Sequence, residues 1–332
     1  MTKTIQEVSS IMKSLRSEHI VTERDRKFEA QLFRQFEAEG GETTHHPVRY
    51  TAGTETNGIA IIEGSGGGKT TAIVEVLRSF APLALNPETG APRYLHVKVE
   101  APATLRSLGV AVLKKMGVDE VGSRAKVYEI WEMVRHRLSV MGISLVWIDE
   151  AHDLFGTSAT TETSNMFKML KGLMQGDHPV VLVLSGTERL SAITGLDPQV
   201  NRRFAKIRPK PLAVGVDNRR IKSLVTGYAE KADLKVEVDD ELVNRLMHGS
   251  RYRFGRSVVC ILDAIQCALI DDAEVLGIQH FEDAWAEREA CDVNQNVFSA
   301  VDWMSIELDD EGEEMEARAV VRGKTKRKKG AR

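Results

Sequence analysis

A glycine-rich loop that ends in lysine and threonine is the pattern in this sequence with the clearest chemistry. It consists of Gly64, Ser65, Gly66, Gly67, Gly68, Lys69, Thr70 and Thr71. Glycines let backbone N–H groups turn inward and approach phosphate oxygens without side chains in the way. The lysine would reach the β- and γ-phosphates, and the Thr70 hydroxyl would bind Mg²⁺. The pattern predicts a Walker A loop, followed by a helix whose N-terminus favours the same anion.

One position departs from the Walker A consensus. The first glycine of the motif lies five residues before the glycine that precedes the lysine, and Glu63 occupies that place. Gly64 follows directly and would supply the flexibility if Glu63 is the last residue of a strand. The apolar run Ile59-Ala60-Ile61-Ile62 before the loop is typical of such a buried strand.

Two adjacent carboxylates close another apolar run. Leu145-Val146-Trp147-Ile148 is followed by Asp149 and Glu150, which is a Walker B pattern. Asp149 would belong to the Mg²⁺ shell, and Glu150 would orient and polarise the attacking water. Successive side chains of a strand point to opposite sides, so one carboxylate can face the metal while the other faces the water.

Polar residues at three later positions fit the other needs of such a site. Thr187, preferred to Ser185 at the end of a fourth apolar run, is a candidate sensor of the γ-phosphate or the water. The pair Arg202-Arg203 could contact the nucleotide of a neighbouring subunit, although exposed arginine pairs are often merely solvated. Arg256, at the start of a later helix, could reach back to the phosphates.

The elements that must position these residues alternate between strands and helices. Apolar runs predict strands at 59–62, 94–99, 145–148, 180–184 and, more weakly and at a sheet edge, 207–214. Helical spacing predicts helices at 5–39, 103–116, 125–141 and 165–175, and further helices at 218–231, 240–248, 256–276 and 280–289. This order predicts an α/β fold in which a five-stranded parallel sheet lies between helices and a small all-helical lid follows.

The domain organisation follows from these elements. We expect an N-terminal helical extension and connection at 1–57, a core at 58–215, a helical lid at 216–290 and a flexible C-terminal tail at 291–332. The tail carries an acidic block at 307–316 and a basic block at 322–329, which are usually solvated.

Composition limits the possible classes of protein. The 332 residues carry a formal net charge of −3, so any DNA-binding surface must come from local clustering of Lys and Arg. Three cysteines without a CxxC spacing do not indicate a disulfide framework or a zinc ribbon. No apolar run is long enough for a membrane span, and the N-terminus lacks the apolar segment of a signal peptide. We therefore expect a cytoplasmic protein.

The order of these motifs resembles the AAA+ ATPases, and most closely the transposition regulators of the TniB/TnsC (MuB-like) family. The resemblance covers about residues 58–289. Its more specific signs are Ala101-Pro102, Leu113, Met116-Gly117, Asp149-Glu150-Ala151-His152 and Leu184-Ser185-Gly186-Thr187-Glu188.

The resemblance implies a prokaryotic ATPase that uses ATP and Mg²⁺ and forms rings or filaments on double-stranded DNA. Such proteins recruit a transposase, link it to a target-selection protein or complex, and reset the assembly by hydrolysis. It implies that Arg202 or Arg203 is an arginine finger in trans and that Arg256 is a lid sensor. DNA contacts would come from basic residues after the second strand, namely Lys98, Arg106, Lys114, Lys115 and Lys126.

Other functions use the same motifs. The main alternative is an AAA+ ATPase of signalling or secretion type that acts on protein partners without DNA. A relative of initiators or clamp loaders would often carry a winged-helix domain after the lid, and there is little room for one after Glu289. The run Asp-Glu-Ala-His also occurs in one helicase superfamily, but only helices are predicted where a second motor domain would follow.

Overall fold

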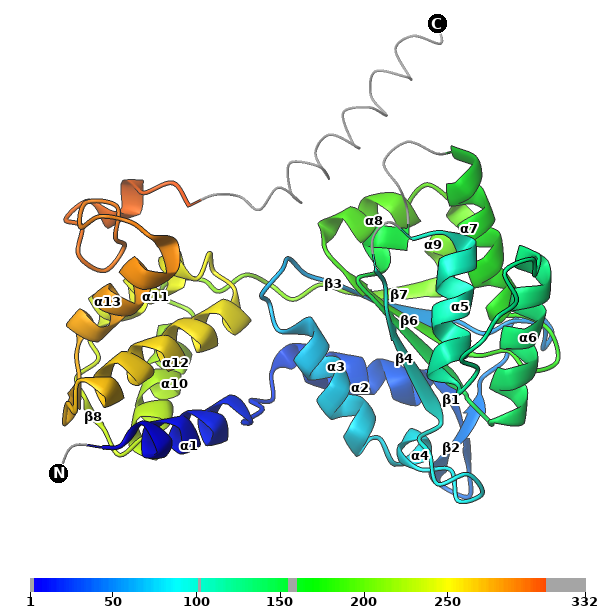
Figure 1. Cartoon of the computed structure of the whole chain (residues 1–332), viewed down its shortest axis with the longest axis horizontal. Coiled ribbons are helices and arrows are strands. Elements are labelled where there is room, and N and C mark those ends of the chain that lie inside the picture. The colour runs from blue at the N-terminus through cyan, green and yellow to red at the C-terminus, as the bar shows by residue number, and fades with distance from the viewer. Residues whose placement is uncertain (1–2, 101–102, 155–159, 309–332) are drawn as a thin grey trace, which may run out of the picture. The chain divides into compact units, whose positions relative to one another are not determined.

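The computed structural model describes residues 3–100, 103–154 and 160–308 (Figure 1). These residues divide into two compact units. Residues 3–20, 66–68 and 210–308 form the helical unit, and the described residues among 21–65 and 69–209 form the sheet unit. No helix in the described ranges is long and apolar enough to cross a membrane.

Five parallel strands form the central sheet of the sheet unit, in the spatial order β4-β5-β6-β3-β7. They are β3 (Gly58–Ile62), β4 (Tyr94–Lys98), β5 (Leu145–Asp149), β6 (Val181–Gly186) and β7 (Phe204–Ile207). β6 separates β3, which leads into the glycine loop, from β5, which ends in the paired carboxylates. The carboxyl ends of β3, β5 and β6 therefore meet at one edge of the sheet, where parallel sheets bind ligands.

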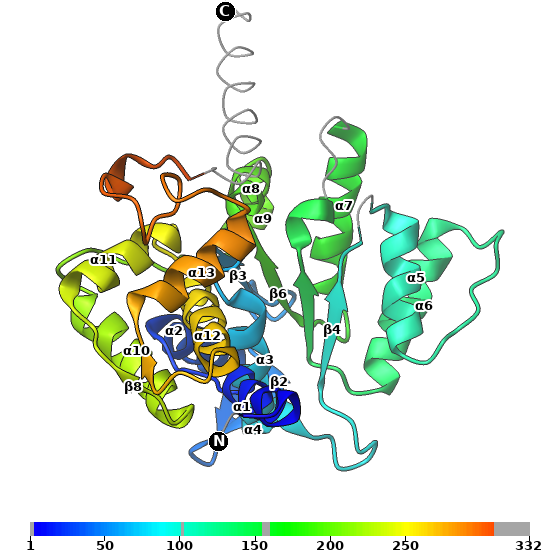
Figure 2. The ribbon, with the colours of Figure 1, turned by 60° about the vertical axis from the view of Figure 1, so that its left-hand side comes forward.

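Helices bury both faces of this sheet. Ile59 and Ile61 pack on one face, and Ala60 and Ile62 pack on the other, as the alternation along a strand requires. The first face lies under α2 (Glu23–Gln35), α3 (Lys69–Ser79) and α4 (Ala81–Ala84). The core of the second face includes α5 (Leu105–Lys115), α6 (Val127–Val140), α7 (Thr160–Leu173), α8 (Glu188–Thr194) and α9 (Pro198–Arg203). Figures 1 and 2 show α5 and α6 side by side near the edge strand β4. The predicted α/β class is confirmed.

The helical unit has a core of its own. Its helices are α1 (Ile5–Arg16), α10 (Asn218–Lys231), α11 (Asp240–Gly249), α12 (Phe254–Ile270) and α13 (Ile278–Glu289). Two short strands, β8 (Lys235–Val236) and β9 (Val275–Leu276), pair in parallel, and the turn η2 (Trp303–Ser305) follows. From α1, Val8 and Met12 pack into the same apolar cluster as Ile261 and Ile265 of α12.

The N-terminal region, predicted to be helical over residues 5–39, is helical for most of that length but not throughout. α1 and α2 are separate helices that belong to different units. Thr22 begins α2 because its side chain and that of Asp25 form a capping box. Residues 36–47, predicted in part as an irregular connection, form a hairpin of β1 (Phe36–Glu39) and β2 (Glu42–Pro47). Cross-strand pairing thus replaces the last predicted helical turn.

The fifth strand and the end of the chain also differ from prediction. β7 spans 204–207 rather than 207–214, because Pro209 and Pro211 have no backbone N–H to continue the ladder. Val297 and Phe298, predicted to lie in a flexible tail, are buried in the core of the helical unit. Arg245 donates to the carbonyl groups of Val297 and Phe298 at 2.8 and 3.1 Å. The predicted boundary at residue 290 therefore lies inside this unit, whereas 309–332 and Ala101-Pro102 lie outside the described residues.

Candidate nucleotide site

The glycine loop has the backbone that a phosphate cradle needs. Gly66 and Gly68 have φ angles of +74° and +96°, a region that side-chain-bearing residues rarely adopt. α3 begins directly afterwards at Lys69. The Lys69 side chain is buried, and its Nζ donates to the carbonyl oxygens of Glu63 at 2.9 Å and Gly64 at 3.3 Å. The ammonium group is therefore held at the loop into which phosphates would bind.

Glu63, at which the loop departs from the Walker A consensus, forms a buried ion pair. Glu63 lies directly after β3, and its Oε2 is 2.6 Å from a guanidinium nitrogen of Arg24 in the first turn of α2. Both side chains are largely buried, with exposed fractions of 12% and 6%. The carboxylate therefore compensates a buried charge and ties α2 to the start of the glycine loop. No pattern in the sequence would have paired these two residues.

We expect Glu63→Gly, which restores the consensus, to destabilise the protein. Removal of one partner of a buried ion pair typically costs about 3–5 kcal/mol, because the remaining charge loses its compensation. Chemical denaturation would measure the free energy of unfolding. Lys27→Ala is the matched control: its exposed ion pair with Glu23 on the same helix should contribute at most about 0.5 kcal/mol. Equal, small losses in both variants would contradict the prediction.

Thr70 and Asp149 meet although 79 residues separate them. The Thr70 Oγ1 donates to Asp149 Oδ2 at 2.9 Å, which joins the start of α3 to the end of β5. A hydroxyl and a carboxylate oxygen suit Mg²⁺, a hard cation that keeps several water and phosphate ligands. No group of three or more His, Cys, Asp or Glu that could hold a metal occurs among the described residues. The Thr70 hydroxyl and the Asp149 carboxylate fit Mg²⁺ that arrives with a nucleotide.

Of the two candidate sensor hydroxyls on β6 and just after it, Ser185 rather than the preferred Thr187 contacts Asp149. It donates to Asp149 Oδ1 and accepts at 2.8 Å from the indole Nε1 of Trp147. The alternation of side chains along β6 could have shown that Ser185 points toward Asp149. Val181, Val183 and Ser185 are alternate residues, and the two valines pack on the face of the sheet that α3 covers. Thr187 lies after the strand, before α8, and its hydroxyl is buried without a hydrogen-bond partner among the described residues. It stays a candidate sensor.

Glu150 has an unusual backbone. Its φ is +52°, in the left-handed region that costs a non-glycine residue about 1–3 kcal/mol. Two hydrogen bonds support it: its own N–H donates to Asp149 Oδ1 at 3.0 Å, and the N–H of Asp153 donates to its carbonyl at 2.9 Å. The chain turns sharply after β5, so the two carboxylates are not simply alternate positions of one strand.

The two arginines of the predicted pair have different surroundings. Arg203 is 5% exposed, forms an ion pair with the buried Glu55 and donates to the carbonyl of Gln199 at 2.9 Å. A hydrogen bond from Thr51 and the ion pair with Arg203 lower the pKa of Glu55 against the opposing effect of burial. The Arg202 side chain is 62% exposed and lies 3.5 Å from Glu55. Arg202 is therefore the one that could reach another molecule.

Comparison with known proteins identifies the chain. The model of the bacterial TniB protein family matches residues 45–212, about half of the chain and most of the sheet unit. The chain belongs to the TniB family. No match was found among curated proteins.

Solved structures similar to this TniB-family chain include AAA+ proteins of archaea. Orc1 of Aeropyrum pernix, solved in complex with DNA, has a TM-score of 0.57 at 17% identity, over 84% of this chain and 68% of that one. Cdc6p of Pyrobaculum aerophilum has a TM-score of 0.58 at 11% identity, over 84% and 70%. At such identities the likeness concerns the fold, which is that of the AAA+ ATPases.

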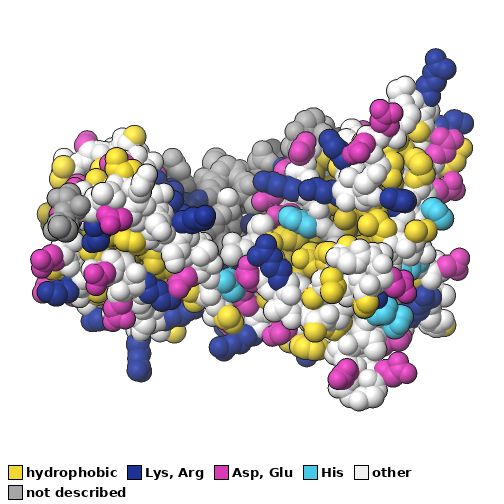
Figure 3. Space-filling model, turned by 60° about the horizontal axis from the view of Figure 1, so that its bottom comes forward, with side chains coloured by type: hydrophobic (Ala, Val, Ile, Leu, Met, Phe, Trp, Pro, Cys, Tyr) yellow, Lys and Arg dark blue, Asp and Glu magenta, His cyan; other side chains and the backbone are white. Residues whose placement is uncertain are grey.

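The candidate DNA contacts of this TniB-family chain differ in their surroundings. The guanidinium of Arg106 donates to the carbonyl groups of Gly122, Ser123 and Ala125, so it holds the loop before α6. Lys126 is exposed at the start of α6, and Lys98 is exposed at the end of β4. The exposed Lys114 and Lys115 lie in the last turn of α5, a helix about 15 Å long. On the face shown in Figure 3, Lys and Arg side chains lie interspersed with Asp and Glu.

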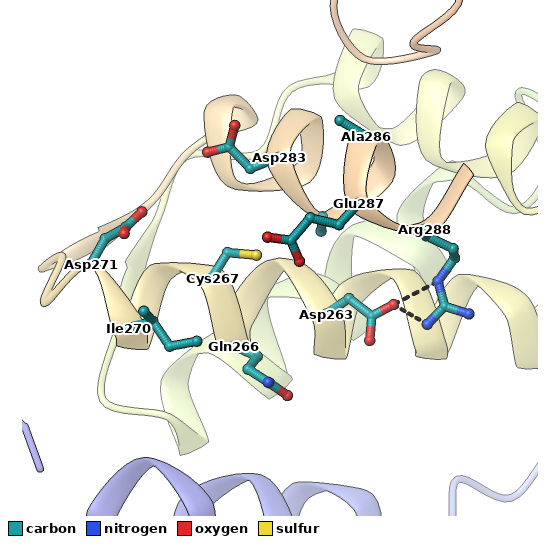
Figure 4. A pocket seen from close by; sticks show the side chains of 10 residues that line it. Asp263, Gln266, Cys267, Ile270, Asp271, Asp283, Ala286, Glu287 and Arg288 are labelled. Carbon is teal, nitrogen blue, oxygen red and sulfur yellow. Dashed lines mark hydrogen bonds and ion pairs between the residues drawn. The ribbon is translucent and has the colours of Figure 1, made fainter. Parts of the chain in front are cut away.

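The helical unit contains the last predicted site residue and an acidic groove. Arg256 is half-buried in the first turn of α12, where burial and then the nearby Arg251 and Arg253 lower its pKa to about 10. Its contact with phosphates stays a prediction. A groove of about 690 Å³ between α12 and α13 has more acidic than basic residues in its lining: Asp263, Asp271, Asp283 and Glu287 against Arg288 (Figure 4). Like charges repel, so this face is unsuited to a phosphate backbone.

Proposed function

We propose that this protein is an ATP-hydrolysing switch of DNA transposition. One observation carries the ATPase part: Thr70 and Asp149 are hydrogen-bonded beside a glycine loop of phosphate-binding shape, with Glu150 next in the chain. The transposition part rests on membership of the TniB family. In the ATP-bound state the protein assembles on double-stranded DNA, recruits and activates a transposase, and links it to a target-selection factor.

Different residues of the site bind the phosphates and activate the water. The backbone N–H groups of the glycine loop hold the ATP phosphates, and Lys69 moves from the loop carbonyls to the β- and γ-phosphates. Glu150 polarises a water and accepts its proton as the water oxygen attacks the γ-phosphorus. The bond from that phosphorus to the β–γ bridging oxygen breaks, which yields ADP and phosphate. Bound Mg²⁺, held through Thr70 and Asp149, would neutralise phosphate charge.

ATP hydrolysis can act as a switch because residues of two neighbouring subunits form each nucleotide site. Arg202 is exposed, so it can contact the γ-phosphate in the site of a neighbouring subunit of a homo-oligomer. Loss of the γ-phosphate removes the group to which Arg202 binds, which weakens the subunit interface and resets the assembly. Lys98 and Lys126 are our first candidates for phosphate contacts with DNA. Such contacts would be independent of sequence and sensitive to salt.

A direct test mixes the purified protein with a non-hydrolysable ATP analogue and random duplex DNA, and examines the mixture by electron microscopy. We expect rings or filaments that require both ligands. Samples that lack one ligand, and the variant Lys69→Ala with both, should show neither. Nucleotide-bound monomers that ignore DNA would contradict the proposal and favour an AAA+ ATPase of signalling or secretion type that acts on protein partners.

A further inference from the structure

The hydrolysis mechanism leaves His152, the last residue of the Asp-Glu-Ala-His run, without a role. It lies in η1 (Ala151–Leu154), the turn that follows β5, and its side chain is buried. Its Nδ1 is 3.4 Å from Oε2 of Glu150, the carboxylate proposed to polarise water. Its Nε2 is 3.8 Å from Oδ1 of Asp153. The imidazole therefore lies between two carboxylates.

These contacts continue to the helix that follows β6. A guanidinium nitrogen of Arg189, in the first turn of α8, lies 3.9 Å from the same oxygen of Asp153. η1 packs against both α8 and β6. A row of polar groups thus runs from Glu150 through His152 and Asp153 to Arg189. These separations of 3.4–3.9 Å place the proposed water-polarising carboxylate in line with a charged group of α8.

Gly186, the last residue of β6, makes room for this imidazole. A Cβ atom built at Gly186 would lie 3.0 Å from His152 Nδ1 and 3.2 Å from a methyl carbon of Leu190. Its φ is not in the left-handed region, so the backbone does not require glycine there. A side chain at this position would therefore crowd both the histidine ring and Leu190.

We propose that His152 is a positioning residue for Glu150, and that Gly186 provides the space for it. The Glu150 side chain extends from a left-handed backbone, and the His152 ring lies where it can support the carboxylate. The Nδ1 side of the ring provides this support. A separation of 3.4 Å is long for a hydrogen bond, but catalytic hydrogen bonds often shorten once substrate is bound. The inference rests on the proposed ATP hydrolysis.

The first test measures kcat and ATP affinity for His152→Ala, with duplex DNA present. A misplaced catalytic group can cost about 10²-fold in rate, so we expect kcat to fall by up to about 100-fold while the dissociation constant for ATP is unchanged. The same change in a Glu150→Gln background should add no further loss, because residues that act as a unit are not additive. A merely structural role would instead lower both activity and thermal stability in either background.

Conservative variants of His152 distinguish the contribution of Nδ1 from that of Nε2. The amide nitrogen of Asn can occupy a place close to Nδ1, whereas that of Gln reaches the place of Nε2. We expect His152→Asn to recover most of kcat and His152→Gln to recover little. Gly186→Ala should also lower kcat, because its methyl group would displace the His152 ring while the sequence at Glu150 stays unchanged. Gly172→Ala is its control, because a Cβ there meets nothing within 4 Å.

The outcomes distinguish this inference from the function on which it rests. If the wild-type protein does not hydrolyse ATP, both fail. If the wild-type protein is active and His152→Ala keeps its kcat, only the inference fails. Losses that add fully to those of Glu150→Gln would also overturn it, and so would equal kcat values for the Asn and Gln variants.

Discussion

Glu150→Gln is expected to stop ATP turnover while ATP binding persists. The amide has the shape of the carboxylate but cannot accept the proton of the attacking water, and a positioned base contributes about 10²–10⁴-fold in rate. Lys69, Thr70 and Asp149 keep their contacts, because neither the 2.9 Å bond from Thr70 nor the glycine loop involves the Glu150 side chain. The variant should therefore remain in the ATP-bound state.

Phosphate release and nucleotide-binding assays would measure the two effects separately. Assemblies that Glu150→Gln forms with ATP on DNA should persist, whereas those of the wild-type protein should dissociate as ATP is consumed. Lys69→Ala is the contrasting variant, since it should lose ATP binding itself. Near-normal phosphate release by Glu150→Gln would show that another residue polarises the water.

Replacement of the two neighbouring arginines should have opposite consequences. Arg202→Ala should lower hydrolysis in the assembled state by about 10³–10⁵-fold, the range known for arginine fingers, with little change in stability, because its side chain is 62% exposed. Arg203→Ala should destabilise the fold by about 3–5 kcal/mol, because it leaves the buried Glu55 without its main ion pair. Thermal or chemical unfolding and ATP turnover would distinguish the two variants.

Mixed assemblies test whether Arg202 acts on a neighbouring subunit. Subunits with Glu150→Gln keep Arg202 and can complete the site of an Arg202→Ala subunit, whose own Glu150 is intact. We expect a mixture of the two inactive variants to regain part of the wild-type turnover. Failure to regain activity, although the two variants assemble together, would rule out action in trans.

Motifs formed by consecutive residues could be predicted from the sequence. The glycine loop follows its strand directly, and the pair Asp149-Glu150 follows another strand directly. Each motif consists of consecutive residues, so local backbone geometry positions it. Continuous apolar runs between helical patterns predicted the five-stranded parallel sheet, because such runs are typical of strands covered on both faces. The weakest run placed β7 several residues too late, since periodicity alone does not show where two prolines end pairing.

Contacts between distant segments were decided by the tertiary structure. Arg24 and Glu63 are 39 residues apart and meet only when α2 packs beside β3. The difference between Arg202 and Arg203 depends on Glu55, a residue of the connection before β3.

The packing of β6 against β5 decides that Ser185 rather than Thr187 contacts Asp149. The packing of β6 against η1 brings His152 close to Gly186. The sequence by itself thus determined the class of the sheet and the residue types of the candidate site, because these depend on composition and short spacings. Which side chains support that chemistry depends on packing and burial, which arise only when segments far apart in the chain come together.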